Sequence, residues 1–221
     1  MPPCAWVGLR APVTGHVRPH RSPHAIQSLR MKSTLLHNMV VTLFLLSQVH
    51  VADAQEPADG FLCCNMRTDG SWISDSNYAE SGKRIIPFGT PVKYLGMGRY
   101  RVYVEIDGKR QALGNDYSRD ISMDAFARRY IVKDDPRSKV LEAQPKIRTA
   151  IETARVAKGM TKHQVLMAIG YPISSENPNL DVRRWRYWLW SFSPFTVYFD
   201  EAGLLVRVES DNETLLKVFF E

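Results

Sequence analysis

The sequence has few of the residues on which many catalytic and metal sites depend. Its 221 residues include three cysteines and six histidines, and His163 is the only histidine after position 50. A zinc site built from several histidines is therefore excluded from the rest of the chain. The patterns Gly-x-Ser-x-Gly and His-Glu-x-x-His and the phosphate-binding loop are also missing. We therefore expect no catalytic residue, no metal and no cofactor, and we predict that the protein is not an enzyme.

Long apolar runs are missing as well, and the clearest short one has the features of a secretion signal. The run Met39–Leu46 falls far short of the roughly 20 residues that cross a membrane. It follows the bases Arg30 and Lys32 and precedes Ala52-Asp53-Ala54, which has the pattern of a cleavage site. This order predicts a signal peptide at residues 31–54, with an N-terminal anchor or a buried helix as the alternatives.

The positive charge of the chain is concentrated in this N-terminal part. The 29 basic and 23 acidic residues give a net charge of +6 and a pI of about 9.3, which would favour nucleic acid or an anionic membrane as a partner. Five of the bases and one of the acids lie in residues 1–54, so the remainder carries a net charge of +2. Residues 1–30 hold five prolines and no acid, and we interpret them as a misassigned or unstructured extension before a start at Met31. We predict a periplasmic protein with no nucleic-acid partner.

Two of the three cysteines are adjacent. Cys4 lies in the predicted extension, whereas Cys63 and Cys64 follow the predicted cleavage site. Neighbouring Cα atoms lie about 3.8 Å apart, below the usual disulfide range of about 4.4–6.8 Å. A ring between them would be strained, so we expect that one pairs with another chain or that both stay reduced. The residues Gly60-Phe-Leu before Cys63 lack the Leu-x-Ala/Gly-Cys pattern, so lipidation of either cysteine is not the favoured interpretation.

Residues 61–133 carry the signals of a small β-sheet. Tyr100–Ile106 alternates in polarity, Asp107-Gly108 is a strong hairpin turn, and Lys109–Leu113 is the return strand. The alternation predicts a small, curved antiparallel sheet, with three apolar residues on one face. These are Val102, Val104 and Ile106.

Two further segments flank this hairpin. Val92–Leu95 is predicted as a short strand that ends at Gly96, and Asp124–Tyr130 is predicted as a short helix. The pattern Ile-Pro-x-Gly-Thr-x-Val, together with the hairpin, resembles bacterial SH3-like barrels over residues 85–114.

Residues 137–221 change the pattern to two helices followed by strands. Helical spacing predicts a helix from Pro145 to Lys158, which Gly159 ends. Thr161 and Gln164 form a capping box at the start of a second helix, which ends at Gly170. Three strands follow, and the final segment is either a strand or a helical tail; these segments are Arg184–Trp190, Phe195–Phe199, Leu204–Glu209 and Leu215–Phe220. The whole predicts an α+β protein with modules at residues 61–133 and 137–221.

The second module carries a combination of motifs that points to a known family. Gly159-Met-Thr-x-x-Gln-Val leads to Ile-Gly170-x-Pro172, then to Trp185-Arg-Tyr187, and then to Val197-x-Phe-Asp with Gly203 in the following turn. This combination resembles the SmpA/OmlA/BamE family over residues 147–208. The resemblance implies two helices packed on a three-stranded antiparallel sheet. It also implies small outer-membrane lipoproteins of the machinery that folds β-barrels, which bind protein partners and anionic lipid and carry out no reaction.

This resemblance favours one function over two others. We expect a non-enzymatic exported envelope protein that binds a protein partner at the periplasmic face of the outer membrane, with an anionic lipid surface as a second partner. The alternatives are a peptidoglycan- or peptide-binding envelope module and an inhibitor of a secreted enzyme, because β-lactamase-inhibitor-like proteins share this fold.

Candidate binding residues lie on one predicted strand. Period-two alternation turns Trp185, Tyr187 and Leu189 toward the helices and turns four residues the other way. Exposed tryptophan beside arginine is enriched at protein interfaces and suits a membrane surface. The alternative is that the first module covers these rings. The four outward residues are Arg184, Arg186, Trp188 and Trp190.

A second candidate contact site is the polar loop that follows the predicted hairpin. It contains Asn115, Asp116, Tyr117 and Arg119. Asp116 also recurs at spacing four with Asp120 and Asp124, which favours a polar loop that caps a helix over a cation site. We interpret His163 as a solvated residue in the first turn of its helix.

Overall fold

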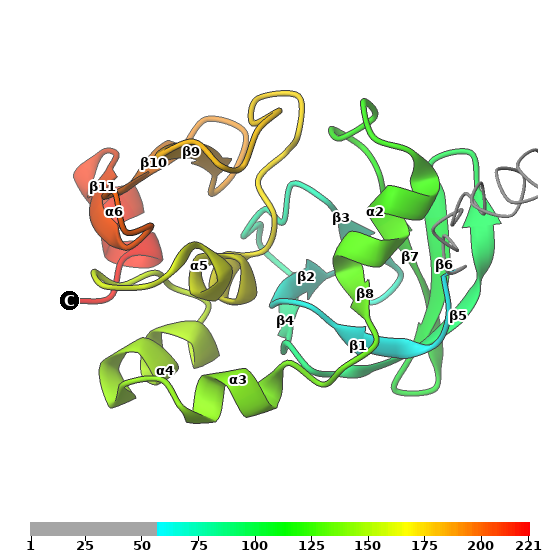
Figure 1. The fold of residues 1–221 in the computed structure, drawn as a ribbon. Helices are drawn as coiled ribbons and strands as arrows, with labels where there is room; N and C mark the ends of the chain where they lie inside the picture. The colour runs from blue at the N-terminus through cyan, green and yellow to red at the C-terminus, as the bar shows by residue number, and fades with distance from the viewer. Residues whose placement is uncertain (1–56) are drawn as a thin grey trace, which may run out of the picture. The chain divides into compact units, whose positions relative to one another are not determined.

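The computed structural model describes residues 57–221, which form a mixed α+β fold with two separate β-sheets (Figure 1). These residues belong to one compact unit. The predicted extension at residues 1–30 and the predicted signal peptide at residues 31–54 lie outside the described residues. In the part of the chain that is described, no helix is long and apolar enough to cross a membrane.

The first sheet has eight strands in the order β4-β2-β3-β7-β6-β5-β1-β8. The predicted hairpin is β6 and β7, which pair from Ile106↔Lys109 to Arg101↔Gly114. All neighbouring pairs are antiparallel except β3 and β7, which run parallel. The expected antiparallel sheet therefore contains one parallel pair. The strands are β1 (Gly60–Leu62), β2 (Met66–Thr68), β3 (Trp72–Ser74), β4 (Arg84–Ile86), β5 (Pro91–Gly98), β6 (Arg101–Ile106), β7 (Lys109–Gly114) and β8 (Ile131–Val132).

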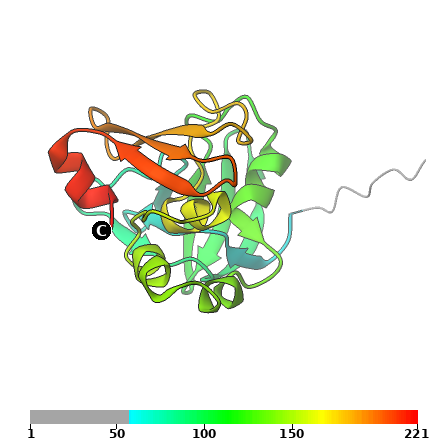
Figure 2. The same cartoon turned by 60° about the vertical axis from the view of Figure 1, so that its left-hand side comes forward.

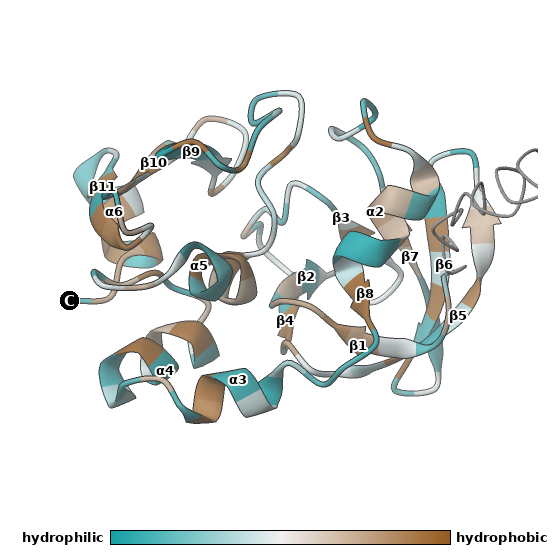
Figure 3. Cartoon of the chain, in the orientation of Figure 1, coloured by the Kyte–Doolittle hydropathy of each residue, from teal (hydrophilic) through white to brown (hydrophobic). Residues whose placement is uncertain are grey.

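One face of this sheet forms the first hydrophobic core. Val102, Val104 and Ile106 are all buried, which confirms the predicted apolar face of β6. Helix α2 (Met123–Tyr130) covers this core with Phe126 and Tyr130. Figure 3 shows the polar band of α2 beside the apolar β8. The helix begins at Met123, one residue before the predicted start, because the Ser122 side chain accepts a hydrogen bond from the backbone N–H of Ala125 and caps it there.

Strand β5 is longer than predicted. Gly96 was expected to end it, but the strand continues to Gly98. The register shifts between Tyr94 and Gly96, and Gly96 adopts a φ of +117°. Glycine reaches this conformation without steric cost, so the residue makes an irregularity within the strand rather than a stop.

The second half contains a three-stranded antiparallel sheet in the order β11-β10-β9. Its strands are β9 (Arg184–Trp188), β10 (Pro194–Phe199) and β11 (Leu205–Glu209), and its helices are α3 (Arg137–Leu141), α4 (Pro145–Glu152), α5 (Lys162–Ile169) and α6 (Asn212–Val218). Figure 2 shows α5 beneath this sheet. The predicted capping box is confirmed, since Thr161 and Gln164 each accept a backbone hydrogen bond from the other. The final segment, which the sequence left open, is mainly helical.

Helix α4 is shorter than predicted, because it ends at Glu152 and not at Lys158. Ala154 adopts a φ of +52°, and the backbone N–H groups of Ala154 and Arg155 donate to Ile151 and Ala150. This is a Schellman ending with alanine in the position that glycine usually occupies, so the sequence did not signal it. The chain then pairs in extended form with the C-terminal segment, through the backbone of Val156.

The inner face of the second sheet forms the second core. Trp185, Tyr187 and Leu189 are buried, as period-two alternation predicted. Trp185 packs against Phe199 with ring centroids 4.7 Å apart, and Tyr187 stacks on Phe195 at 5.3 Å. Buried residues of α4 and α5 complete this cluster. Because these aromatic side chains fill the inner face of the sheet, its outer face is the one exposed to solvent.

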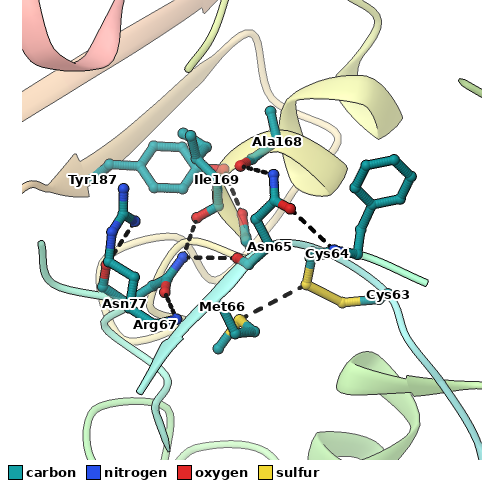
Figure 4. The surroundings of a disulfide bond; sticks show 11 residues. Cys63, Cys64, Asn65, Met66, Arg67, Asn77, Ala168, Ile169 and Tyr187 are labelled. Carbon is teal, nitrogen blue, oxygen red and sulfur yellow. Dashed lines mark hydrogen bonds between the residues drawn. A yellow bond between two sulfur atoms is a disulfide. The ribbon is translucent and has the colours of Figure 1, made fainter. Parts of the chain in front are cut away.

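Two buried asparagines join the two halves (Figure 4). The side chain of Asn65 donates to the carbonyls of Ile151 (2.6 Å) and Ala168 (3.0 Å) and accepts from the N–H of Phe88 (3.0 Å). Asn77 donates to the carbonyl of Ile169 (2.9 Å), the last residue of α5, the helix that also contains Ala168. Both side chains are almost fully buried. We call Asn65 and Asn77 the polar junction.

The adjacent cysteines form a disulfide with each other, so the expectation that they stay reduced or pair with another chain is wrong. In an extended strand neighbouring side chains point to opposite faces. Here β1 ends at Leu62 and the chain bends at Cys63 and Cys64, which lets both side chains turn to the same side. Both cysteines are buried within the first core. Figure 4 shows the bond beside the polar junction.

Candidate binding surface

The outer face of the three-stranded sheet displays polar and aromatic side chains. The pairings Tyr198↔Arg184 and Thr196↔Arg186 place these residues side by side on adjacent strands. Tyr198 also pairs with Arg207 on β11. Since alternate residues point to opposite faces, the burial of Trp185 and Tyr187 leaves the arginines of β9 facing solvent.

A groove of about 860 Å³ runs over this face. Its floor comes from β9 and β10, and one wall comes from the loop before β9. We call it the arginine groove. It is lined by Glu176, Asn177, Pro178, Asn179, Val182, Arg183, Arg184, Arg186, Thr196, Tyr198 and Phe199.

Asn177 fixes the wall of the arginine groove to the edge of β9. Its side chain accepts from the backbone N–H of Arg186 (2.8 Å) and donates to the carbonyl of the same residue (3.0 Å). It also donates to the carbonyl of Ile173 (3.0 Å). A buried amide thus occupies the hydrogen-bonding positions that another strand would use. The wall and floor of the groove are therefore held in one geometry.

The arginines of the groove differ in their ionic partners. Arg186 lies 3.2 Å from Glu176, and Arg183 lies 3.3 Å from Glu201. Among the described residues, no ion pair involves Arg184, which is exposed. A guanidinium offers five hydrogen-bond donors in a planar fork that matches a carboxylate. Arg184 therefore gives the groove its free anion-binding capacity.

Aromatic rings hold the neighbouring guanidinium groups in place. The Arg186 guanidinium lies 4.8 Å from the Trp188 ring centroid, and the Arg207 guanidinium lies 3.9 Å from that of Tyr198. The indole N–H of Trp188 donates to Glu176 at 3.0 Å. Arg184, Arg186 and Trp188 thus come together as predicted on one face.

Trp190 departs from the predicted alternation. Strand β9 ends at Trp188, and the chain turns, with Leu189 and Ser193 paired through their backbone. Trp190 is half-buried against the second core, and the Lys217 ammonium lies 4.3 Å from its ring. The strand period cannot be extended beyond the point where the strand ends. Trp190 therefore supports α6 and does not line the arginine groove.

The polar loop after β7 makes mostly internal contacts. Asn115 is buried, and Asp116 accepts from the Ser74 hydroxyl (2.9 Å) and lies 3.4 Å from Arg101. The carboxylate of Asp75, which sequence reasoning missed, accepts from the backbone N–H groups of Asp116 and Tyr117. Burial raises the pKa of Asp75.

Only part of this loop is available to a partner. Tyr117 is exposed, and so is Arg119, whose guanidinium lies 4.5 Å from the Tyr100 ring. Asp120 accepts a hydrogen bond from Ser174, so the aspartates of this segment have separate partners. None of these loop residues lines the arginine groove. The structure therefore does not bring the two predicted contact sites into one pocket.

The structure does bring Cys63 and His163 to one small pocket of about 140 Å³, which sequence reasoning did not foresee. Surrounding protein atoms, and then the charge of Lys139, lower the pKa of His163. The sulfur of Cys63 is bonded to Cys64 and is therefore no thiol nucleophile in this form. Within the described part of the chain, no cluster of His, Cys, Asp and Glu could hold a metal ion.

Comparison of the chain with protein-family models, curated proteins and solved structures found no match. The arginine groove, with its rigid wall and an exposed Arg184 that forms no ion pair among the described residues, is the candidate binding surface of the molecule.

Proposed function

We propose that the chain is a non-enzymatic exported envelope protein that binds a protein partner through the arginine groove. We place the protein at the periplasmic face of the outer membrane, like the BamE-like assembly factors that its second module resembles. The observation that carries the proposal is the groove on the outer face of the second sheet, where Arg184 lies beside Arg186 and Tyr198 without an ionic partner.

The chemistry of the groove favours a protein ligand with acidic side chains. Arginine and aromatic residues are enriched at protein interfaces, where they supply both apolar area and directed hydrogen bonds. Val182 adds exposed apolar surface at the wall. A carboxylate of the ligand would bind Arg184, which has no ionic partner to displace. Arg186 already pairs with Glu176, so it would not have to be desolvated by the same carboxylate. The rigid wall reduces the entropy lost on binding.

The proposal is tested by recovery of partners from envelope extracts of the source organism. The tagged protein is expected to retain outer-membrane assembly components, and Arg184→Glu is expected to lose them, because it places a carboxylate opposite the acidic ligand. Arg84→Glu is the matched control, since Arg84 is an exposed arginine on a strand of the other sheet. Sequencing of the mature N-terminus tests export, with cleavage expected before Gln55.

Three outcomes would contradict this function. The unchanged protein could retain no assembly component, or the two variants could lose partners equally. A third is co-sedimentation of the protein with purified peptidoglycan without recovery of any protein, which would favour the wall-binding alternative.

A further inference from the structure

Strand β11 is an edge strand with a backbone position that faces away from its neighbour. The N–H of Phe199 donates to Arg183 and that of Leu189 donates to Ser193, so the odd-numbered residues of β10 bond toward β9. The even-numbered residues Thr196 and Tyr198 therefore bond toward β11, opposite Glu209 and Arg207. Val208 lies between these partners and directs its N–H and C=O away from the sheet.

Earlier in β11, the outward-facing backbone groups of Leu205 already have hydrogen-bond partners. Leu205 donates to the carbonyl of Met160 and accepts from the N–H of Gly159. Among the described residues, no backbone hydrogen bond outside the sheet involves Val208. An unpaired strand edge of this kind is a template for another strand.

A groove of about 740 Å³ lies along this edge. One side is Val208, and the other is α6 with the C-terminal segment, where Leu215, Phe219 and Phe220 line the groove. Leu216 lies at the same site and is 80% exposed, so it extends the apolar lining that Leu215, Phe219 and Phe220 provide. We call this the edge groove. Apolar surface beside a free strand edge suits the alternate side chains of an added strand.

The charged residues of the edge groove favour an acidic ligand. Three bases line it, and Glu221 is the one acidic side chain that does so. Arg207 is paired with Glu209 at 2.9 Å. In the described structure neither Arg155 nor Lys158 takes part in an ion pair. Two cations thus flank the apolar surface without an ion-pair partner, beside the single acidic side chain of Glu221.

We propose that the edge groove binds an extended, acidic segment of a partner protein as a fourth strand beside β11. The backbone of the segment pairs with Val208, its apolar side chains contact Phe219 and Phe220, and its carboxylates reach Arg155 and Lys158. A second copy of this chain fits less well, because two copies paired along β11 would bring the same bases toward each other. The edge groove shares no lining residue with the arginine groove, so this inference stands apart from the proposed function.

The direct test is the rate of amide hydrogen exchange at Val208, which nuclear magnetic resonance measures on the chain from Gln55 to Glu221, within the compact unit that holds the groove. The probe is a synthetic ten-residue peptide of alternating valine and glutamate, and the control is the same peptide with lysine in place of glutamate. The acidic peptide is expected to slow exchange of the Val208 amide, because it accepts that hydrogen bond. Unchanged exchange with the acidic peptide, or equal slowing by the lysine peptide, would overturn the proposal.

Variants separate the backbone contribution from the charge contribution. Val208→Pro removes the N–H donor and is expected to weaken peptide binding about tenfold, which corresponds to one hydrogen bond. Val208→Thr keeps the donor and is expected to bind like the unchanged protein. Lys158→Glu tests the charge if the proline variant does not fold, and it is also expected to weaken binding.

In the free protein, the edge of β11 at Val208 is expected to be unoccupied. The Val208 amide is expected to exchange quickly without peptide, and analytical ultracentrifugation is expected to give a monomer. Slow exchange in a dimer would show that a second copy occupies the edge groove and would overturn the peptide proposal. Arg184→Glu leaves the edge groove intact, so loss of partners at the arginine groove and loss of peptide binding are separate results.

Discussion

The polar junction and the arginine groove both use polar side chains of the same protein, but they place them in opposite surroundings. Asn65 is 2% exposed and makes three hydrogen bonds: two reach the carbonyls of α4 and α5, and the third comes from Phe88 in its own half. Arg184 and Arg186 face solvent, and Arg186 has one ionic partner. A buried donor or acceptor that loses its partner has no water to replace it, whereas an exposed one does. We therefore expect the junction to determine stability and the groove to determine binding.

The largest expected effect is at the junction. Asn65→Ala removes three hydrogen bonds and leaves the carbonyls of Ile151 and Ala168 without this donor. Because these groups are buried, we expect the free energy of unfolding to fall by about 3–5 kcal/mol, measured by chemical denaturation.

An exposed asparagine provides the matched control for this experiment. Asn179 accepts one hydrogen bond, from the N–H of Asp181 (2.7 Å), in the loop before β9. Asn179→Ala is expected to change stability by less than about 1 kcal/mol. Similar losses in the two variants would show that burial does not distinguish the junction from the surface.

The second prediction concerns α5, which contacts the polar junction and the inner face of the sheet whose outer face carries the arginine groove. Its C-terminal carbonyls accept from Asn65 and Asn77, and its side chains pack beneath the second sheet. Thr161→Ala removes the side-chain half of the capping box and is expected to lower the free energy of unfolding by about 1 kcal/mol. Thr161→Ser keeps the hydroxyl, so a large loss in that variant would contradict a capping role.

The sequence predicts the parts of the fold that follow local rules. Asp107-Gly108 marks the β6–β7 hairpin, and the capping box marks the start of α5. It does not predict β1 to β4, since strands of three residues are too short to show a period. The parallel pairing of β3 with β7 joins segments about 40 residues apart and depends on the path of the chain between them.

The candidate site shows the same limit. The outward direction of Arg184 and Arg186 follows from the period of β9, and that prediction holds for as long as the strand does. The pairing of Glu176 with Arg186 and the attachment of Asn177 to β9 depend on the path of an irregular loop. Asn65 and Asn77 look like ordinary loop residues in the sequence, because only tertiary packing buries them.

An exposed histidine at the edge of a small pocket gives a third prediction. The folded protein lowers the pKa of His163 below its ordinary value of 6.5, so the unfolded chain takes up a proton first as the pH falls. The contribution of His163 to stability is therefore complete above about pH 6.5 and is lost as the pH falls toward its folded-state pKa. His163→Gln is expected to flatten this part of the stability profile, measured by denaturation between pH 5 and 8. An unchanged slope would assign the dependence to other groups.

The smallest expected effect is at the arginine groove. Arg186→Ala removes the ion pair with Glu176 and the contact with the Trp188 ring. Both partners remain hydrated, and exposed ion pairs contribute about 0–1 kcal/mol, so we expect a loss of at most about 1 kcal/mol. Partner recovery is expected to fall in the same variant, because the guanidinium at the groove floor is gone. A loss as large as that of Asn65→Ala would mean that the groove is a structural element, and its polar face would then belong with the junction.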